Sequence, residues 1–190
     1  MAESDLLQYK AVDKLSVKKM RKRLTHCIKS LMVLLCAVAI STLMSGCDTV
    51  DNKRLPAVPV QIVLSDPGGW ITYGVSGAMQ SRRFIRALKV PADFPYTSTT
   101  FTGYGGVLLV SDVFGNPQAY DLACPVEGKA DVRVEIDKES AVAKCPKCKS
   151  TYDVFANEGS PLSGDAARLG YGLTRYNVYH NPGVSYVIAR

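Results

Sequence analysis

Three cysteines and a glutamate are spaced as the ligands of a single metal ion often are. CPVE places Cys124 and Glu127 three residues apart, and after seventeen intervening residues CPKC places Cys145 and Cys148 three apart. Ligand pairs of this spacing, separated by a segment of that length, are typical of zinc sites. Zn²⁺ accepts thiolate and carboxylate ligands in tetrahedral geometry. Cys124, Glu127, Cys145 and Cys148 are therefore candidate ligands of one zinc ion.

The same three cysteines allow two other interpretations. A disulfide from Cys124 to Cys145 or Cys148 would join strand ends of a small domain and leave one thiol free. A variant 2Fe–2S cluster held by the three cysteines and an oxygen ligand is the other alternative. Neighbouring positive charge lowers a thiol pKa and favours the thiolate that each of these chemistries uses. Three lysines lie beside or between Cys145 and Cys148: Lys144, Lys147 and Lys149.

The elements that must position these residues have the pattern of β-strands. Short apolar or alternating runs, rich in Val, Ile and Tyr, are separated by turns that contain Gly or Pro. We expect strands over residues 58–64, 70–75, 106–112, 118–124, 132–136, 141–145, 150–155, 172–179 and 184–190. The turn DKES predicts a hairpin from 132–136 into 141–145, ending at Cys145. Residues 76–88 come nearest to a helical pattern. The sequence predicts an all-β domain, a small sandwich or barrel of antiparallel strands.

The cysteine segments are followed by further residues in a distinctive order. YDLACPVE ends in the first loop, CPKCKSTYDVF carries Ser150, Tyr152 and Asp153 after the second, and GSPLSGDAARLGYGLTRYNV closes the stretch. In this order, residues 106–178 resemble the Rieske iron–sulfur domain family. There a C-x-H loop and a C-P-x-H-G-S-x-F/Y-D loop face each other across a cluster. The resemblance implies a Rieske-like β domain with Cys124 and Cys145 at the two cysteine positions. Asp165 stands where the family usually has proline.

The histidine ligands of that family are missing from this sequence. A Rieske centre holds one iron with two cysteines and the other with two histidines. The corresponding positions are Val126, which has no donor atom, and Cys148. After residue 46 the sequence contains one histidine, His180. Two-histidine ligation within one such chain is therefore excluded.

The first residues have the pattern of a bacterial lipoprotein leader. A basic segment (18–29) precedes an apolar run (30–46) that ends in LMSGC. This resembles a lipobox, which implies that residues 1–46 are a cleaved signal peptide and that Cys47 is lipidated. Translation starting at Met20 is also consistent with this pattern. An uncleaved membrane anchor is the alternative, although the apolar run is short for a span. We expect a tether over 47–59 and the β domain over 60–190.

The net charge of the chain lies mainly in this leader. The whole sequence carries +6, from 23 Lys and Arg against 17 Asp and Glu. Residues 1–46 hold eight of the basic and three of the acidic residues, which leaves 15 and 14 for the rest. A near-neutral domain lacks the basic footprint of a nucleic-acid-binding protein. We therefore expect no nucleic-acid partner, a membrane contact through lipid on Cys47, and a protein partner in the cell envelope as an open possibility.

The sequence predicts a lipid-anchored cell-envelope protein whose Rieske-like domain lacks the histidine ligands. We expect a non-catalytic structural or binding module, because no Ser-His-Asp set, phosphate loop or carboxylate pair argues for an enzyme. The alternatives are an electron-transfer protein with a cysteine-rich variant 2Fe–2S centre and a zinc-stabilised domain. Any cofactor would accordingly be zinc or such a cluster.

Overall fold

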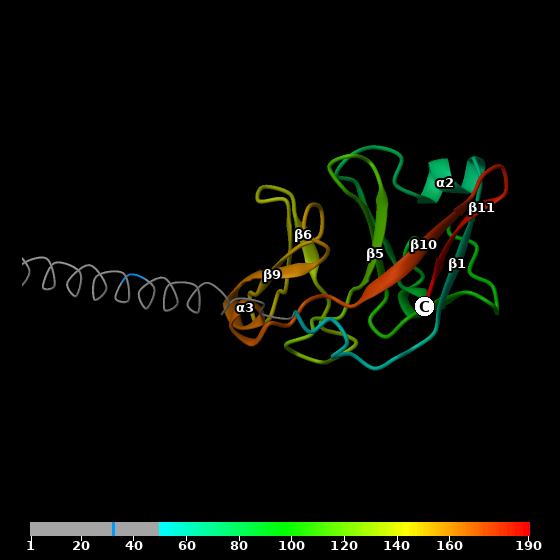
Figure 1. Ribbon diagram of the computed structural model, residues 1–190. Helices are drawn as coiled ribbons and strands as arrows, with labels where there is room; N and C mark the ends of the chain where they lie inside the picture. The colour runs from blue at the N-terminus through cyan, green and yellow to red at the C-terminus, as the bar shows by residue number, and fades with distance from the viewer. Residues whose placement is uncertain (1–31, 33–49) are drawn as a thin grey trace, which may run out of the picture. The chain divides into compact units, whose positions relative to one another are not determined.

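The computed structural model of the protein describes Met32 and residues 50–190 (Figure 1). Apart from Met32, the predicted signal peptide lies outside the described residues, as does the predicted lipidation site Cys47. Residues 50–190 belong to one compact unit, to which the rest of this description refers.

The larger of two antiparallel sheets in this unit has seven strands in the order β2-β4-β5-β10-β11-β1-β3. It curves into a nearly closed, barrel-like sheet with β2 and β3 at its edges (Figure 1). The prediction of an all-β, antiparallel domain is therefore confirmed. The strands are β1 (Val60–Ser65), β2 (Ser81–Phe84), β3 (Phe101–Thr102), β4 (Val107–Ser111), β5 (Pro117–Asp121), β10 (Arg175–Asn181) and β11 (Ser185–Ala189).

The smaller sheet has four strands in the order β6-β7-β8-β9, inserted in the chain between β5 and β10. The predicted hairpin into Cys145 is confirmed, since β6 pairs with β7 and Ile136 lies opposite Ala143. The strand bounds are β6 (Glu135–Asp137), β7 (Val142–Lys144), β8 (Thr151–Asp153) and β9 (Ser160–Ser163).

Helices in the described part are short: α2 (Gly68–Tyr73), the 3₁₀ turn η1 (Arg86–Leu88) and α3 (Gly164–Leu169). None of them has both the length and the apolar character needed to cross a bilayer. The strand expected at 70–75 is wrong, because most of that segment forms α2. Trp70 is the one buried residue of α2, and its ring stacks on Tyr186 at 3.7 Å, whereas Ile71 is exposed. The strand was predicted from the apolar composition of this segment, but its side chains are not buried in the alternating pattern of a strand.

Strand β4 is buried on both faces because it separates two hydrophobic clusters. Leu108 and Val110 point into a cluster that contains Cys124 and Cys145. Val107 and Leu109 point into a second cluster inside the larger sheet. Since successive side chains of a strand alternate between faces, one continuous apolar run serves both cores. Cys124 and Cys145 are thus part of a packed interior.

The segment 50–55, the strap, packs against the domain. Within the predicted tether, residues 50–59 are described. Asp51 forms a parallel bridge to Tyr171, Leu55 is buried, and the Arg54 guanidinium donates to the Pro125 carbonyl at 3.1 Å. Contacts to residues far along the chain hold the polar, proline-bearing segment in place.

Candidate metal centre

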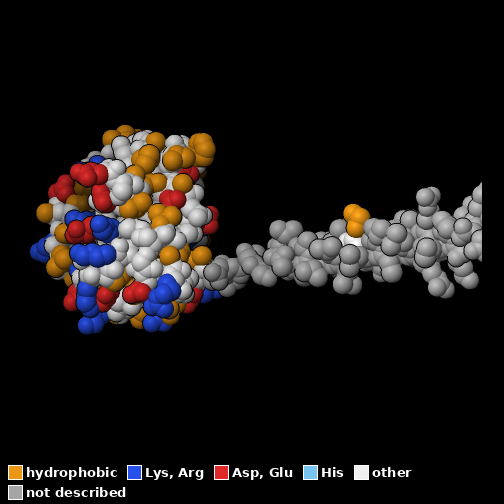
Figure 2. Space-filling view, turned by 90° about the vertical axis from the view of Figure 1, so that its left-hand side faces the viewer, with side chains coloured by type: hydrophobic (Ala, Val, Ile, Leu, Met, Phe, Trp, Pro, Cys, Tyr) orange, Lys and Arg blue, Asp and Glu red, His pale blue; other side chains and the backbone are white. Residues whose placement is uncertain are grey.

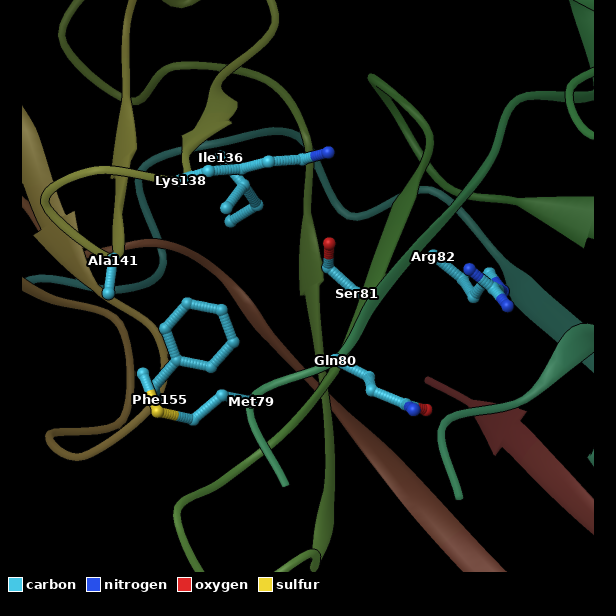
Figure 3. Close-up of a pocket in the computed structure, with 8 residues that line it drawn as sticks. All are labelled: Met79, Gln80, Ser81, Arg82, Ile136, Lys138, Ala141 and Phe155. Atoms are coloured by element: carbon cyan, nitrogen blue, oxygen red, sulfur yellow. The ribbon is translucent and has the colours of Figure 1, made fainter. Parts of the chain in front are cut away.

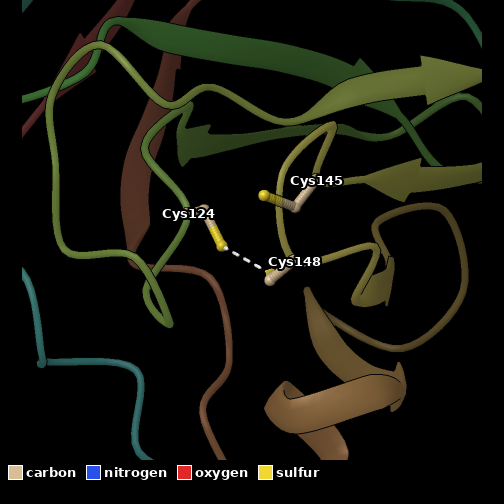
Figure 4. A group of neighbouring side chains, drawn as sticks. All are labelled: Cys124, Cys145 and Cys148. Carbon is tan, nitrogen blue, oxygen red and sulfur yellow. Dashed lines mark hydrogen bonds between the residues drawn. The ribbon is translucent and has the colours of Figure 1, made fainter.

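The three domain cysteines converge at one point (Figure 4). Their sulfur atoms all lie within 4.8 Å of one another, and Cys124 Sγ is 3.6 Å from Cys148 Sγ. Cys124 and Cys145 are fully buried, and Cys148 is partly exposed. All three are free thiols. The structure thus brings the thiols of the two cysteine loops together.

Cys124 begins a tight loop just after β5. Its backbone N–H donates to Val132 O at 2.9 Å, and its carbonyl accepts from Gly128 N at 2.9 Å. Gly128 has φ of +63°, a conformation that side chains other than glycine rarely adopt. The Tyr104 hydroxyl donates to the Gly128 carbonyl at 3.0 Å. Backbone hydrogen bonds therefore fix the direction of the first thiol before any ligand binds.

A buried carboxylate, Asp121, supports the start of this loop. Its two oxygens accept from the backbone N–H groups of Tyr104, Gly105 and Ala123 at 2.7–3.0 Å and from the Tyr176 hydroxyl. Burial raises the pKa of Asp121, although these hydrogen bonds oppose the shift. The carboxylate thus supplies acceptors for three backbone N–H groups that have no hydrogen-bond partner within a strand.

Cys145 and Cys148 lie in the loop that joins β7 to β8. Cys145 N donates to Ser150 O at 2.9 Å, which closes the loop, and Lys149 N donates to Cys145 O at 3.1 Å. Lys149 adopts a left-handed φ of +61°. This turn brings both thiols of the CPKC segment to the same side, facing the Cys124 loop (Figure 4).

Ser150 connects the second loop to α3. It is fully buried, and its Oγ accepts from Ala166 N at 3.1 Å and from the Cys148 thiol at 3.3 Å. A Cβ on Gly164 would lie 2.8 Å from this oxygen, so close packing requires glycine there. The short helix is therefore positioned directly against the cysteine loop.

The surroundings shift the pKa values of the Cys124 and Cys148 thiols in opposite directions. Burial raises the pKa of the Cys124 thiol to about 12. Burial also disfavours the Cys148 thiolate, but hydrogen bonds with Ser150 and the neighbouring thiols outweigh it and lower the pKa of Cys148. The flanking lysines, expected to lower the thiol pKa, are engaged in part elsewhere. Lys147 pairs with Glu127, and Lys149 Nζ donates to the Pro146 carbonyl at 2.5 Å.

Glu127, the fourth predicted ligand, does not join the cluster of thiols. Its carboxylate forms an ion pair with Lys147, which stands between the two cysteines of the second loop. The group of possible ligand atoms that lie together consists of the three sulfurs. Glu127 nevertheless lies on the first cysteine loop and contacts the second loop through this pair.

The residues at the family's histidine positions do not suit a two-histidine cluster. Val126 packs beside the hydrophobic cluster around the cysteines, and Cys148 supplies a thiol. His180 lies in β10, where its ring stacks on Tyr186 at 4.0 Å and its Nε2 is 3.2 Å from Asp66 Oδ2. The donor set therefore does not fit the Rieske cluster that the resemblance implies.

Three mutually close sulfurs suit one ion better than a two-iron cluster. Zn–S bonds of about 2.3 Å in tetrahedral geometry place the sulfurs about 3.8 Å apart, near the observed 3.6 Å for Cys124 and Cys148. In a 2Fe–2S cluster the protein ligands are divided between two irons, which separates them further. The site can bind a thiophilic ion with little movement of its loops.

Sequence reasoning named the thiols but missed the groups that hold them. The Tyr152 hydroxyl lies 3.5 Å from Cys124 Sγ, Asp121 supports the first loop, and Arg54 binds its Pro125 carbonyl. The signal for Tyr152 was available: strand alternation after Ser150 points it to the same side. Nothing local in the sequence links Arg54 to a loop 71 residues away.

The chain was also compared with known proteins. A scan against models of protein families finds no match, and neither does a search of curated proteins or of solved structures.

Proposed function

We propose that this chain is a non-catalytic module whose two cysteine loops are joined by one zinc ion. The observation that carries the proposal is the convergence of three sulfurs within 4.8 Å, two of them fully buried. Cys145 and Cys148 lie 21 and 24 residues after Cys124, on a separate loop, and the fold still brings all three thiols together, as ligands of one ion must be. Thiolates are ligands that zinc prefers, and binding to such a site contributes directly to folding.

Glu127 is the residue we assign to the fourth ligand position. Structural zinc sites are almost always four-coordinate. Glu127 is three residues from Cys124 and already contacts the second loop through Lys147. When zinc is bound, its positive charge competes with Lys147 for the carboxylate. The ion would supply no redox chemistry, so the module would bind or brace rather than transfer electrons.

The Rieske-like identity of the domain belongs to the same proposal. It is supported by the insertion of the small sheet, which carries the second cysteine loop, between β5 and β10 of the larger sheet. The cell-envelope location and the lipid on Cys47 rest on the leader sequence. On the face in Figure 2, Lys and Arg side chains lie among Asp and Glu side chains, so this face has no continuous basic patch of the kind that binds nucleic acid.

Metal content of the full-length chain, purified without oxygen, tests the proposal. We expect one zinc per chain, lost in Cys145→Ser and bound more weakly in Glu127→Ala. Glu158→Ala is the matched control, because Glu158 is also ion-paired, to Arg175, but is absent from the thiol cluster. Iron with acid-labile sulfide would instead support the electron-transfer alternative. A metal-free protein that keeps its fold would overturn both.

A further inference from the structure

A groove, whose lining includes none of the three cysteines, separates the free edges of the two sheets. Strand β2 is an edge of the larger sheet, and β6 is an edge of the smaller one. A cavity of about 440 Å³ lies between them (Figure 3) and shares four lining residues with a second of about 390 Å³. The shared residues are Ser81, Arg82, Ile136 and Lys138.

The backbone of β2 presents hydrogen-bonding groups to this groove. Gln80 O accepts from Ser111 N, so Gln80 directs its backbone groups towards β4. In an antiparallel ladder the direction alternates from residue to residue. Arg82 therefore also faces β4, whereas Ser81 and Arg83 direct their N–H and C=O groups away from the sheet. No described residue lies beside them as a paired strand.

At the next outward-facing residue along this edge, the backbone groups are already paired with another segment of the same chain. Ile85, two residues after Arg83, exchanges both backbone hydrogen bonds with Val90, at 2.8 and 3.1 Å. That bridge is antiparallel and isolated. No further bridge follows this pair, and residues 91–94 form bends and a turn. A short extended segment thus fits this edge, and the pairing stops just where the groove begins.

The opposite wall presents a second free edge. Val134 N donates to Leu122 O, away from β7, and β6 pairs with β7 through the residues that follow. By the same alternation, Ile136 directs its backbone groups away from β7. Ile136 also lines both cavities, so this unpaired edge of β6 borders the groove. An extended backbone between the walls would meet unfilled donors and acceptors on both sides.

Side chains divide the groove into an apolar end and a basic rim. Met79, Ala141 and Phe155 lie at the apolar end, and Lys138 extends along the rim (Figure 3). Arg83 is 3.8 Å from Glu135 and is compensated by it. Lys138 forms no ion pair with any residue from 50 to 190. Its uncompensated charge favours a partner with an acidic side chain.

We propose that this groove binds an extended, acidic peptide segment of a partner protein as an added β-strand. Backbone hydrogen bonds to Ser81, Arg83 and Ile136 supply the affinity, as in other cases of strand addition. An apolar side chain enters the Met79–Phe155 end, and an acidic one pairs with Lys138. The inference does not depend on whether the cysteines bind metal.

Fluorescence polarisation with the full-length chain tests the proposal. The probe is a labelled seven-residue peptide of alternating valine and aspartate. Ser81→Pro removes the outward N–H without removing a bond to β4, and we expect it to weaken binding about fivefold or more. Ser81→Ala, which keeps that N–H, is the matched control and should bind within about twofold of the wild type. Lys138→Glu should also weaken binding.

Two further measurements make the outcome independent of whether Ser81→Pro folds. In the wild type, the peptide should slow hydrogen exchange at Ser81 and Arg83. The same peptide with alternate backbone nitrogens methylated should bind at least about fivefold more weakly. Equal binding by the methylated peptide, or no binding at about 1 mM peptide, overturns the proposal. Concentration-dependent self-association abolished by Ser81→Pro would also overturn it, because it assigns the edge to a second copy of the chain.

Discussion

Ser150 shows how one buried hydroxyl can control a reactive thiol. Its Oγ accepts a hydrogen bond from Ala166 N and another from the Cys148 thiol. Hydrogen bonds with Ser150 are among the interactions that lower the pKa of Cys148 against the effect of burial. A change at Ser150 should therefore alter both the stability of the loop and the chemistry of the thiol.

We expect Ser150→Ala to raise the pKa of Cys148. At a fixed pH below that pKa, the thiolate fraction falls and alkylation of Cys148 by iodoacetamide slows in the metal-free protein. The free energy of unfolding should decrease by about 1–3 kcal/mol, because the buried Ala166 N–H loses its acceptor. Ser163→Ala, which removes an exposed hydroxyl bonded to Thr151, is the control. An unchanged pH profile of alkylation would contradict the role of Ser150.

The residues of the candidate metal site could be predicted from the sequence to different degrees. Cysteine spacing alone identified the three thiols, since few other residue patterns place ligands so regularly. The pairing of Glu127 was not predictable, because its partner Lys147 lies 20 residues away and meets it only through tertiary structure. Asp121 gave no sequence signal, because nothing in YDLAC marks an aspartate that will be buried.

At the scale of elements, β4 makes a comparison between adjacent leucines informative. Leu108 and Leu109 are both buried, but they face different clusters, and only the Leu108 cluster contains Cys124. Each Leu→Ala substitution should lower the free energy of unfolding by about 2–5 kcal/mol.

We expect Leu108→Ala to speed alkylation of Cys124 well below the melting temperature, because the cavity it leaves lies in the cluster around that thiol. Leu109→Ala is the matched control, with a similar loss of stability and little change in this rate. Equal acceleration in both variants would mean that Cys124 is reached only through global unfolding.

Asp66 fastens the hairpin of β10 and β11 to the end of β1. Its Oδ2 accepts from Gly183 N at 3.0 Å and lies 3.2 Å from His180 Nε2. The hydrogen bonds to His180 and Gly183 hold the pKa of Asp66 below its ordinary 3.8. A lowered folded-state pKa contributes stability above the unfolded-state pKa, and that stability is lost as the pH falls through the folded-state value.

Asp66→Asn should therefore be less stable than the wild type at pH 5, and the difference should shrink as the pH falls below 3.8. Urea unfolding monitored by the fluorescence of Trp70, which stacks on Tyr186 in this hairpin, measures it. Asp131→Asn, which removes an exposed carboxylate, is the control. A difference that persists unchanged to pH 2 would show that the hairpin is held by other contacts.

Strands were predicted better than helices for a physical reason. The alternation of β1 and the continuous apolar run of β4 report burial directly, and both predictions hold. Helices α2 and α3 have six residues each, fewer than two turns, so neither shows a helical period. Each depends on tertiary contacts, α2 on the stacking of Trp70 and α3 on the Ser150 hydroxyl.

On the scale of the whole unit, the strap connects its N-terminal end to the cysteine region. Arg54 binds the Pro125 carbonyl and lies 4.5 Å from the centre of the Tyr171 ring. We expect Arg54→Ala to increase proteolysis within residues 50–59 and to lower the free energy of unfolding by about 1–2 kcal/mol. Limited proteolysis followed by mass spectrometry measures the first effect. Arg168→Ala, which removes an exposed ion pair with Asp165 and no contact to residues 50–59, is the control.

The strap also determines how the unit would respond to tension. A pull on the chain at residue 50 acts first on the two hydrogen bonds between Asp51 and the Gly170–Gly172 segment, and then on Arg54. Only after these contacts release does the load reach β1, which is hydrogen-bonded along both edges. Force would thus detach the strap, and with it the Arg54 contact to the carbonyl next to Cys124, before it opens the barrel-like sheet.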